Sequence, residues 1–192
     1  MAAPPYPDPK DQPELMHAIR KSLNKIPNGL FVLTAEHEDR RGGMVVSWVQ
    51  QVCDSPPMVS VAIEKGKAIM PLISESRKFA LCQLSDNDRL MQRKFAQDSE
   101  INEDPFLGFS LRESVQGKVP IMTDSMAWLE CHLSCHMDVE GDHDLFVGAI
   151  CGGGTNGRGD DPLVRYTPVP ALEDLEENAE AQRNGKKSSG KK

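Results

Sequence analysis

The sequence predicts a mainly β fold of the α+β class, a barrel or sandwich with a few attached helices. Short runs rich in Val, Phe and Ile are separated by turns that contain Gly, Pro and Asn, which is typical of consecutive strands. The segments with helical periodicity are few and do not alternate regularly with the strands, as they would in a doubly wound sheet. With 192 residues the chain is long enough for one domain with a buried core.

The two ends of the chain differ in composition from the middle. Residues 1–12 carry four prolines and little that is apolar, which predicts a flexible leader. Residues 172–192 form an acidic run followed by a basic run without core residues, which predicts a disordered charged tail. The folded domain is therefore expected to cover residues 13–171.

Between these ends the hydrophobic pattern predicts the following elements. Helices are expected where apolar residues recur at helical spacing, at residues 14–26, 68–76 and 87–98. Strands are expected where short β-branched and aromatic runs lie between turns, at residues 29–36, 43–52, 58–64, 79–84, 118–121, 128–139, 144–151 and 163–167.

Composition excludes several classes of function. The net charge of −7 argues against nucleic acid as a partner, because phosphate binding needs a basic surface. No run approaches the roughly 18 apolar residues of a membrane span, and the first residues lack the basic and apolar regions of a secretory signal. Five cysteines are then expected as reduced thiols rather than disulfides. Together these features predict a soluble, cytoplasmic protein.

A cluster of cysteines and histidines, 128-WLECHLSCHMDVEGDH-143, raises the question of a metal site. Alternate residues of a strand face opposite sides, so Cys131 and Cys135 are expected in the core, with His132 and His136 on the other face. A set divided in this way does not converge on one ion, and its spacing matches neither zinc nor haem attachment. We expect no metal here.

Residues 152–157, GGGTNG, match the glycine fingerprint of dinucleotide sites. That site also needs a helix to begin at the fingerprint, so that the helix N-terminus can hold the pyrophosphate. The following residues, RGDDPLV, contain a proline and no helical period, so a loop is expected instead.

Three segments, in order, resemble the flavin reductase-like family of FMN-binding split barrels. They are 27-PNGLFVLTAE, 43-GMVVSWVQQVCDSPPMVSVAIEKGKAIMPLISESRKFALCQLS and 127-AWLECHLSCHMDVEGDHDLFVGAI. The resemblance spans roughly residues 15–167. It implies a six-stranded Greek-key split β-barrel with peripheral helices. It also implies a homodimer with FMN near the subunit interface and NADH or NADPH as the electron donor.

The resemblance points to one strand and the loop after it as part of the flavin site. The strand is expected to alternate, so that one face lines the flavin ring while main-chain groups reach its pyrimidine edge; its residues are Val45, Val46, Ser47, Trp48 and Val49. By resemblance Ser47 donates its hydroxyl to FMN. Cys53 follows where the family often has Ser, and a thiol is a weaker donor. From its residues alone, the segment favours a core strand over a flavin site.

A basic turn before the second expected helix is the candidate phosphate site. Its residues are Glu64, Lys65, Gly66 and Lys67. A helix N-terminus offers unpaired N–H groups and a positive dipole end, and two lysines add charge. The alternative is a solvated turn with two surface lysines. The family often has a hydroxyl residue in this turn and this chain has none, so backbone and lysine are expected to hold the phosphate.

His143 lies in the turn before the last long strand, where the resemblance implies a position near the flavin and a contact with the nicotinamide or the ring. The alternative is an exposed polar residue of a turn with no role in the site. These features predict an NAD(P)H-dependent flavin or flavoprotein reductase, in which the cofactors supply the chemistry and the protein orients them. A downstream flavin-dependent acceptor is possible. The alternatives are an FMN-binding electron carrier that does not oxidise NAD(P)H, and a barrel that binds no flavin.

Overall fold

The computed structural model describes residues 11–97, 104–112, 114–115, 119–157, 159 and 161–165. The chain divides into two compact units, Met1–Pro27 with Tyr166–Lys192, and Asn28–Arg165. In the first unit the structure describes residues 11–27, which include helix α1, Pro13–Leu23, with a proline in its first turn. Most of the predicted leader and all of the predicted tail lie outside the described residues.

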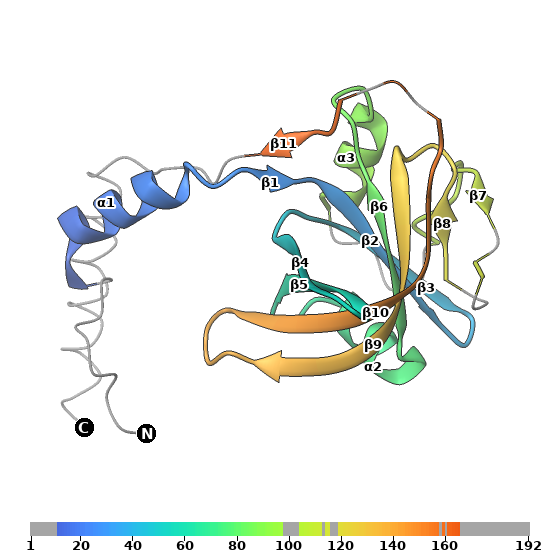
Figure 1. The fold of residues 1–192 in the computed structure, drawn as a ribbon, viewed down its shortest axis with the longest axis horizontal. Coiled ribbons are helices and arrows are strands. Elements are labelled where there is room, and N and C mark those ends of the chain that lie inside the picture. The colour runs from blue at the N-terminus through green and yellow to red at the C-terminus, as the bar shows by residue number, and fades with distance from the viewer. Residues whose placement is uncertain are drawn as a thin grey trace. The chain divides into compact units, whose positions relative to one another are not determined.

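The second unit is built on one antiparallel sheet (Figure 1). Its strands are β2 (Phe31–His37), β3 (Arg40–Val46), β4 (Val49–Asp54), β5 (Pro57–Glu64), β6 (Lys78–Gln83), β9 (Ala127–Asp138) and β10 (His143–Thr155). Their order across the sheet is β3-β2-β6-β9-β10-β5-β4. The sheet is curled, since β3, at one edge, also contacts β5, near the other edge. Between β3 and β4, the carbonyl of Trp48 accepts a hydrogen bond of 3.0 Å from the N–H of Ala62 on β5. The mainly β prediction is confirmed.

Smaller elements complete this unit. Two short pairs flank the sheet, β1 (Asn28–Gly29) with β11 (Val164–Arg165) and β7 (Leu111–Arg112) with β8 (Ile121–Met122). Helix α2 (Ile69–Ser76) packs on β2, β3 and β6, and helix α3 (Arg89–Phe95) packs on β2 and β3. Both helices begin and end within a few residues of the predicted bounds. No described helix is long and apolar enough to cross a membrane.

The main departure from the predicted strands is at residues 43–52. This run forms two strands, because β3 ends at Val46 and β4 begins at Val49. β3 pairs with β2 and β4 pairs with β5, so the chain leaves one edge of the sheet and joins the other at Ser47 and Trp48. The prediction of one alternating strand is wrong, and the sheet in the described residues has seven strands rather than six.

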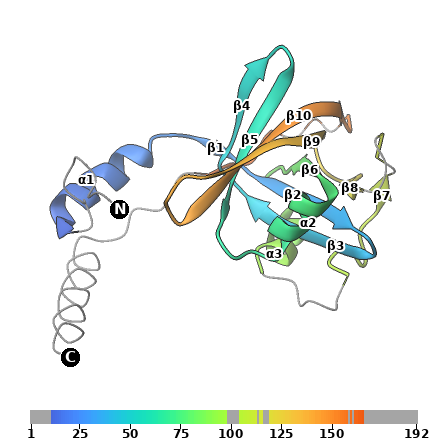
Figure 2. The same ribbon diagram turned by 90° about the horizontal axis from the view of Figure 1, so that it is seen from below.

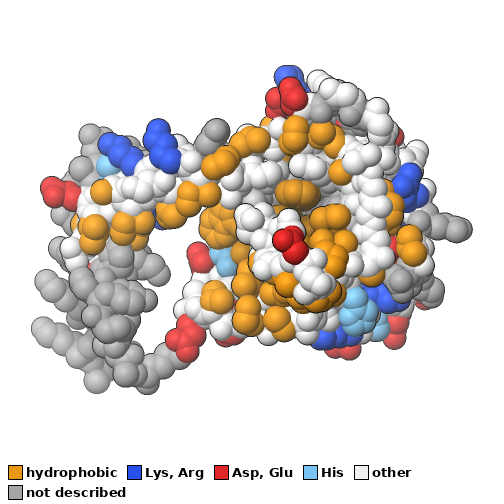
Figure 3. Space-filling view, in the orientation of Figure 1, with side chains coloured by type: hydrophobic (Ala, Val, Ile, Leu, Met, Phe, Trp, Pro, Cys, Tyr) orange, Lys and Arg blue, Asp and Glu red, His pale blue; other side chains and the backbone are white. Residues whose placement is uncertain are grey.

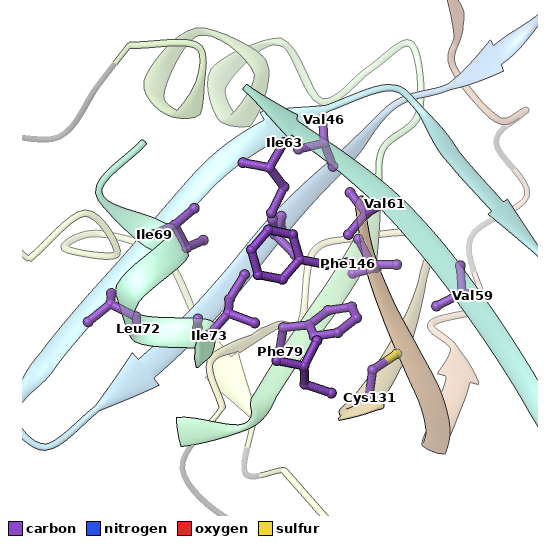
Figure 4. Close-up of a cluster of buried hydrophobic side chains, with 14 residues drawn as sticks. Val46, Val59, Val61, Ile63, Ile69, Leu72, Ile73, Phe79, Cys131 and Phe146 are labelled. Carbon is purple, nitrogen blue, oxygen red and sulfur yellow. The ribbon is translucent and has the colours of Figure 1, made fainter. Parts of the chain in front are cut away.

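The core of the barrel lies between the curled sheet and helix α2 (Figure 4). The rings of Phe79 and Phe146 are fully buried at its centre, and α2 contributes Ile69 and Ile73. Each such side chain stabilises the fold by about 1.5–3 kcal/mol when removed from water. A second buried cluster around Phe95 and Trp128 packs on the other face of the sheet.

A β-bulge changes the pattern of burial along β9. Gly148 pairs with Leu133 but Val147 pairs with Cys135, so one extra residue, Ser134, lies on β9 at this point. Cys131 is 0% exposed, as predicted, but Cys135 is exposed, so that prediction is wrong. The extra residue reverses which side chains face the core.

His136, beyond the bulge, is exposed and is the register partner of Phe146 on β10. Its ring stacks on the core residue Phe146, with ring centroids 4.2 Å apart and planes 12° from parallel. His132, which precedes the bulge, is exposed as predicted.

Residues 152–155 were expected in a loop, and this prediction is also wrong, because they extend β10 to Thr155. Gly152 pairs with Glu130 and Thr155 with Ala127. A Cβ at Gly154 would lie 3.1 Å from Nε1 of Trp128, so the glycines allow the indole to lie close to the strand. No helix begins in the described residues that follow, as the dinucleotide fingerprint would require.

Candidate functional site

Three segments that are distant in sequence meet at one end of β5. They are the strand break at Ser47 and Trp48, the turn of residues 64–67, and the end of the β9–β10 loop at His143. The rings of Trp48 and His143 are in contact, with centroids 4.7 Å apart and planes at 42°. His143 is the register partner of Glu64, and the N–H of Lys65 donates to the carbonyl of Asp142 at 2.9 Å. The fold therefore brings Trp48, the start of the 64–67 turn and His143 to one place.

Trp48 and His143 form a partly exposed aromatic surface. Trp48 lies in the break between β3 and β4, directly before the first residue of β4, and is 45% exposed. His143 is half-buried, and its Nδ1 lies 2.8 Å from a carboxylate oxygen of Asp142. A planar ligand can stack on such a surface, and the free edge of an imidazole can contact a second ring.

The turn of residues 64–67 is open at its tip. Gly66 has a φ of +87°, which side-chain-bearing residues rarely adopt, and no atom lies within 4 Å of where its Cβ would be. Helix α2 begins shortly afterwards, and its cap residue, Ala68, makes no side-chain hydrogen bond. Lys67 is half-buried, with its Nζ 3.2 Å from a carboxylate oxygen of Glu64.

Lys65 is directed to the β9–β10 hairpin. Its Nζ lies 2.7 Å from Oδ1 of Asp138 and 3.6 Å from Oδ1 of Asp144. The hydrogen bond with Asp138 raises the pKa of Lys65, and the same bond lowers the pKa of Asp138. Asp144 is 7% exposed, and its Oδ2 lies 2.8 Å from Nε2 of His136.

Other predicted site residues are placed elsewhere. The side chains of Val45 and Val46 pack with the two core clusters, so these residues do not offer a face to a ring. Val49 is half-buried and packs against the core around Phe146. Cys53 pairs with Met58 near the tip of the β4–β5 hairpin. Six residues of extended strand separate Met58 from Glu64, so Cys53 lies about 20 Å from Glu64. Within one chain the fold does not bring Cys53 to the others.

The sequence did not predict that acidic residues surround Lys65. Asp138, Asp142 and Asp144 flank or belong to the loop before His143, and His136 joins them through Asp144. Their spacing around Gly141 could have suggested a hairpin, but their partners depend on the bulge in β9. In the described part of the chain no group of His, Cys, Asp and Glu side chains is arranged to hold a metal ion.

The fold and this site define a split-barrel protein with a candidate ligand site at one end of β5. The model of the flavin reductase like domain matches residues 23–168. The chain therefore belongs to the flavin reductase-like family.

The curated relatives are much longer proteins. Diflavin flavoprotein A 1 of Synechocystis sp. is 31% identical over 141 residues, which are 73% of this chain and 24% of the relative. Putative diflavin flavoprotein A 1 of Nostoc sp. is 32% identical over 133 residues, 69% of this chain and 23% of the relative. The chain thus spans about a quarter of the length of these relatives.

Solved structures share the fold. Flavin reductase HpaC, complexed with NADP+, superposes with a TM-score of 0.67 at 27% identity, covering 78% of this chain and 92% of HpaC. The NADH:FAD oxidoreductase of Streptomyces globisporus has a TM-score of 0.71 at 21% identity, covering 86% of this chain and 94% of that protein. The second likeness concerns the fold alone.

Proposed function

We propose that this chain is a flavin reductase domain that binds FMN and transfers hydride to it from NADH or NADPH. The observation that carries the proposal is the meeting of Trp48, the turn of residues 64–67 and His143 at one end of β5, in a chain of the flavin reductase-like family. HpaC, which is 27% identical, was solved with NADP+, and this supports a nicotinamide donor.

The residues present fit a flavin mononucleotide. The aromatic surface of Trp48 and His143 offers contact to a flat ring, and the open tip at Gly66 leaves room for a phosphate beside main-chain N–H groups. Lys67 supplies positive charge at the helix end of that turn. When bound, the flavin supplies the hydride-accepting chemistry and the nicotinamide the hydride.

The protein's part in the reaction is orientation. Stacking against Trp48 would set the plane of one ring, and His143 would position the second ring against it. Hydride transfer between two stacked rings needs no acid or base from the protein, so we expect no residue here to be essential as a proton donor.

A homodimer is part of the proposal. The β4–β5 hairpin projects from the barrel (Figure 2), and β4 is an edge strand whose outer side includes Val52, 51% exposed. Hydrophobic side chains gather over this face (Figure 3). Pairing of hairpins from two copies would cover them, and it would carry Cys53 towards the flavin of the other copy, where the family places FMN.

We further infer a cytoplasmic location and a flavin-dependent acceptor downstream. All five cysteines are free thiols, as expected in a reducing compartment where NADH and NADPH are supplied. Reduced flavin is useful only to a protein that consumes its electrons, so a reductase of this kind implies such an acceptor.

The second candidate function is electron transfer by a bound flavin without NAD(P)H oxidation. It is favoured by the curated relatives, diflavin flavoproteins in which the matching segment is about a quarter of the length. A domain within such a protein can receive electrons from a neighbouring domain instead of from a nicotinamide.

Flavin titration and anaerobic reduction separate these functions. FMN should bind the purified protein, and NADH or NADPH should bleach its absorbance; binding without bleaching identifies the carrier. Lys67→Met should lower the affinity for FMN by about tenfold or more and the affinity for riboflavin little, because only FMN has a phosphate for a charge-assisted contact. Lys94→Met, on the exposed side of α3, is the matched control. An equal loss of affinity for both flavins would contradict a phosphate site at Lys67.

A further inference from the structure

Two aspartates face each other at the end of the β9–β10 hairpin. Asp138 is the last residue of β9, and its register partner on β10 is Asp144. Like charges directly opposite each other on a sheet are destabilising, and burial of Asp144 increases the cost. This hairpin therefore requires a positive charge between the two carboxylates.

Lys65 supplies that charge from the neighbouring strand. Its Nζ contacts an oxygen of both carboxylates, at 2.7 Å on Asp138 and 3.6 Å on Asp144. The second oxygen of Asp144 is 2.8 Å from His136, whose ring is fixed by stacking on Phe146. Asp144 is thus anchored in the core and Lys65 ties Asp138 to it.

The same lysine holds the loop that leads into His143, the first residue of β10. Its backbone N–H donates to Asp142, the residue before His143. At the other end of the loop, Oδ1 of Asp138 accepts both Nζ of Lys65 and the N–H of Glu140 at 2.7 Å. Glu140 has a φ of +57°, so the loop includes a left-handed residue that must be held in place.

We propose that Lys65 is a positioning residue that clamps Asp138 to Asp144 and thereby holds His143 against Trp48, while Lys67 is the lysine of the phosphate site. The two lysines of this turn look equivalent in the sequence, and the proposal gives them different roles. The role of Lys67 and the consequence for hydride transfer rest on the proposed function, whereas the clamp itself does not.

The clamp is tested by NMR in the flavin-free protein. Because the two rings are in contact, the Trp48 indole should shift the ring-proton resonances of His143, which are assigned by their loss in His143→Gln. Lys65→Met should move these resonances towards the position of an exposed histidine. The double variant Lys65→Met with Asp138→Asn should return these resonances to their wild-type positions. In this variant the cation is lost, but the repulsion between Asp138 and Asp144 is lost with it. Lys67→Met should leave them unchanged.

Flavin titration of the same variants supplies the second readout. Lys65→Met should change the ratio of FMN to riboflavin affinity by less than about twofold, whereas Lys67→Met should lower it by about tenfold or more. A selective loss of FMN in Lys65→Met, without rescue by Asp138→Asn, would make Lys65 a phosphate ligand and overturn the proposal. Unchanged His143 resonances in Lys65→Met would also overturn it.

The failure of the proposed function has a different signature. If the wild-type protein binds neither flavin, the proposed reductase function fails. The NMR experiment still decides whether Lys65 positions His143, because it is done on the flavin-free protein. Lys65→Gln, which keeps a polar donor without the charge, serves as the second variant: the clamp predicts displacement of His143 in it as well.

Discussion

Cys131 and Cys135 show how one inserted residue changes the environment of a side chain. Both lie at the same parity along β9, yet one is fully buried and the other is exposed beyond the bulge at Ser134. Burial raises the pKa of Cys131 to about 12 and that of Cys82 to about 11, because a thiolate is costly in an apolar environment.

This difference predicts the order of thiol modification. In the native protein at about pH 8, a disulfide reagent should modify Cys135 rapidly, since only exposed thiols with accessible thiolate react. Cys131 and Cys82 should react only after unfolding. Mass spectrometry of labelled peptides gives the order, and early labelling of Cys131 would contradict the buried position.

At the scale of elements, the β9–β10 hairpin determines both the core and the site. Its bulge lies where Gly148 pairs with Leu133, and this glycine is packed against the ring of Phe79. A Cβ at Gly148 would lie 2.5 Å from that ring, which is closer than any real contact. The hairpin can approach the core only because this residue has no side chain.

Gly148→Ala should therefore destabilise the protein. Overpacking of a closed core costs about 1–3 kcal/mol, and the atoms that the added Cβ would meet belong to Phe79 and Cys131, which are both fully buried. Gly141→Ala in the loop is the control, because no atom lies within 4 Å of the added Cβ. Urea unfolding of both variants measures the difference, and equal midpoints would refute the close packing.

The clamp between Lys65 and Asp138 also predicts a pH window. The pKa of Asp138 is lowered from 3.8, so its contribution is present above pH 3.8 and is lost as the pH falls through the lowered value. The pKa of Lys65 is raised from 10.5, so its contribution is present below pH 10.5 and is lost as the pH rises through the raised value.

The difference in melting temperature between wild type and Lys65→Met should therefore be constant between about pH 5 and pH 9 and should narrow outside this range. Because the pair is exposed, salt should reduce the difference at every pH. A difference that vanished near neutral pH would be inconsistent with this pair.

At the scale of the whole molecule, the β4–β5 hairpin projects from the barrel (Figure 2) and ends the sheet with the edge strand β4. An edge strand with exposed apolar residues tends to pair with another chain. Trp48, 45% exposed, directly precedes β4, and Val52, 51% exposed, lies within it, so one interface would reach from the hairpin to the candidate site.

Val52→Glu should therefore convert the proposed dimer to a monomer, because it places a charge in a desolvated interface. Leu107→Glu is the control, since Leu107 is 83% exposed and lies outside this hairpin. Sedimentation velocity at several concentrations checks the outcome. A dimer that persists in Val52→Glu would place the interface elsewhere.

Much of the fold was predictable because it depends on local chemistry. Hydrophobic periodicity located α2, α3 and most strands, since each element buries one face whatever its neighbours are. Turn residues such as Gly66 located the ends of strands, because only certain residues adopt a positive φ. The order of short motifs was sufficient to indicate the family.

The tertiary structure decided what depends on pairing between distant segments. The break at Ser47 and Trp48 follows from the transfer of the chain between two edges of the sheet, and the exposure of Cys135 follows from the register of β9 on β10. Lys65 and Lys67 look equivalent in sequence, but only the fold places Asp138 and Asp144 beside one of them. Periodicity says which residues share a face of a strand, whereas register decides which residues of other strands they meet, and a single inserted residue changes the register.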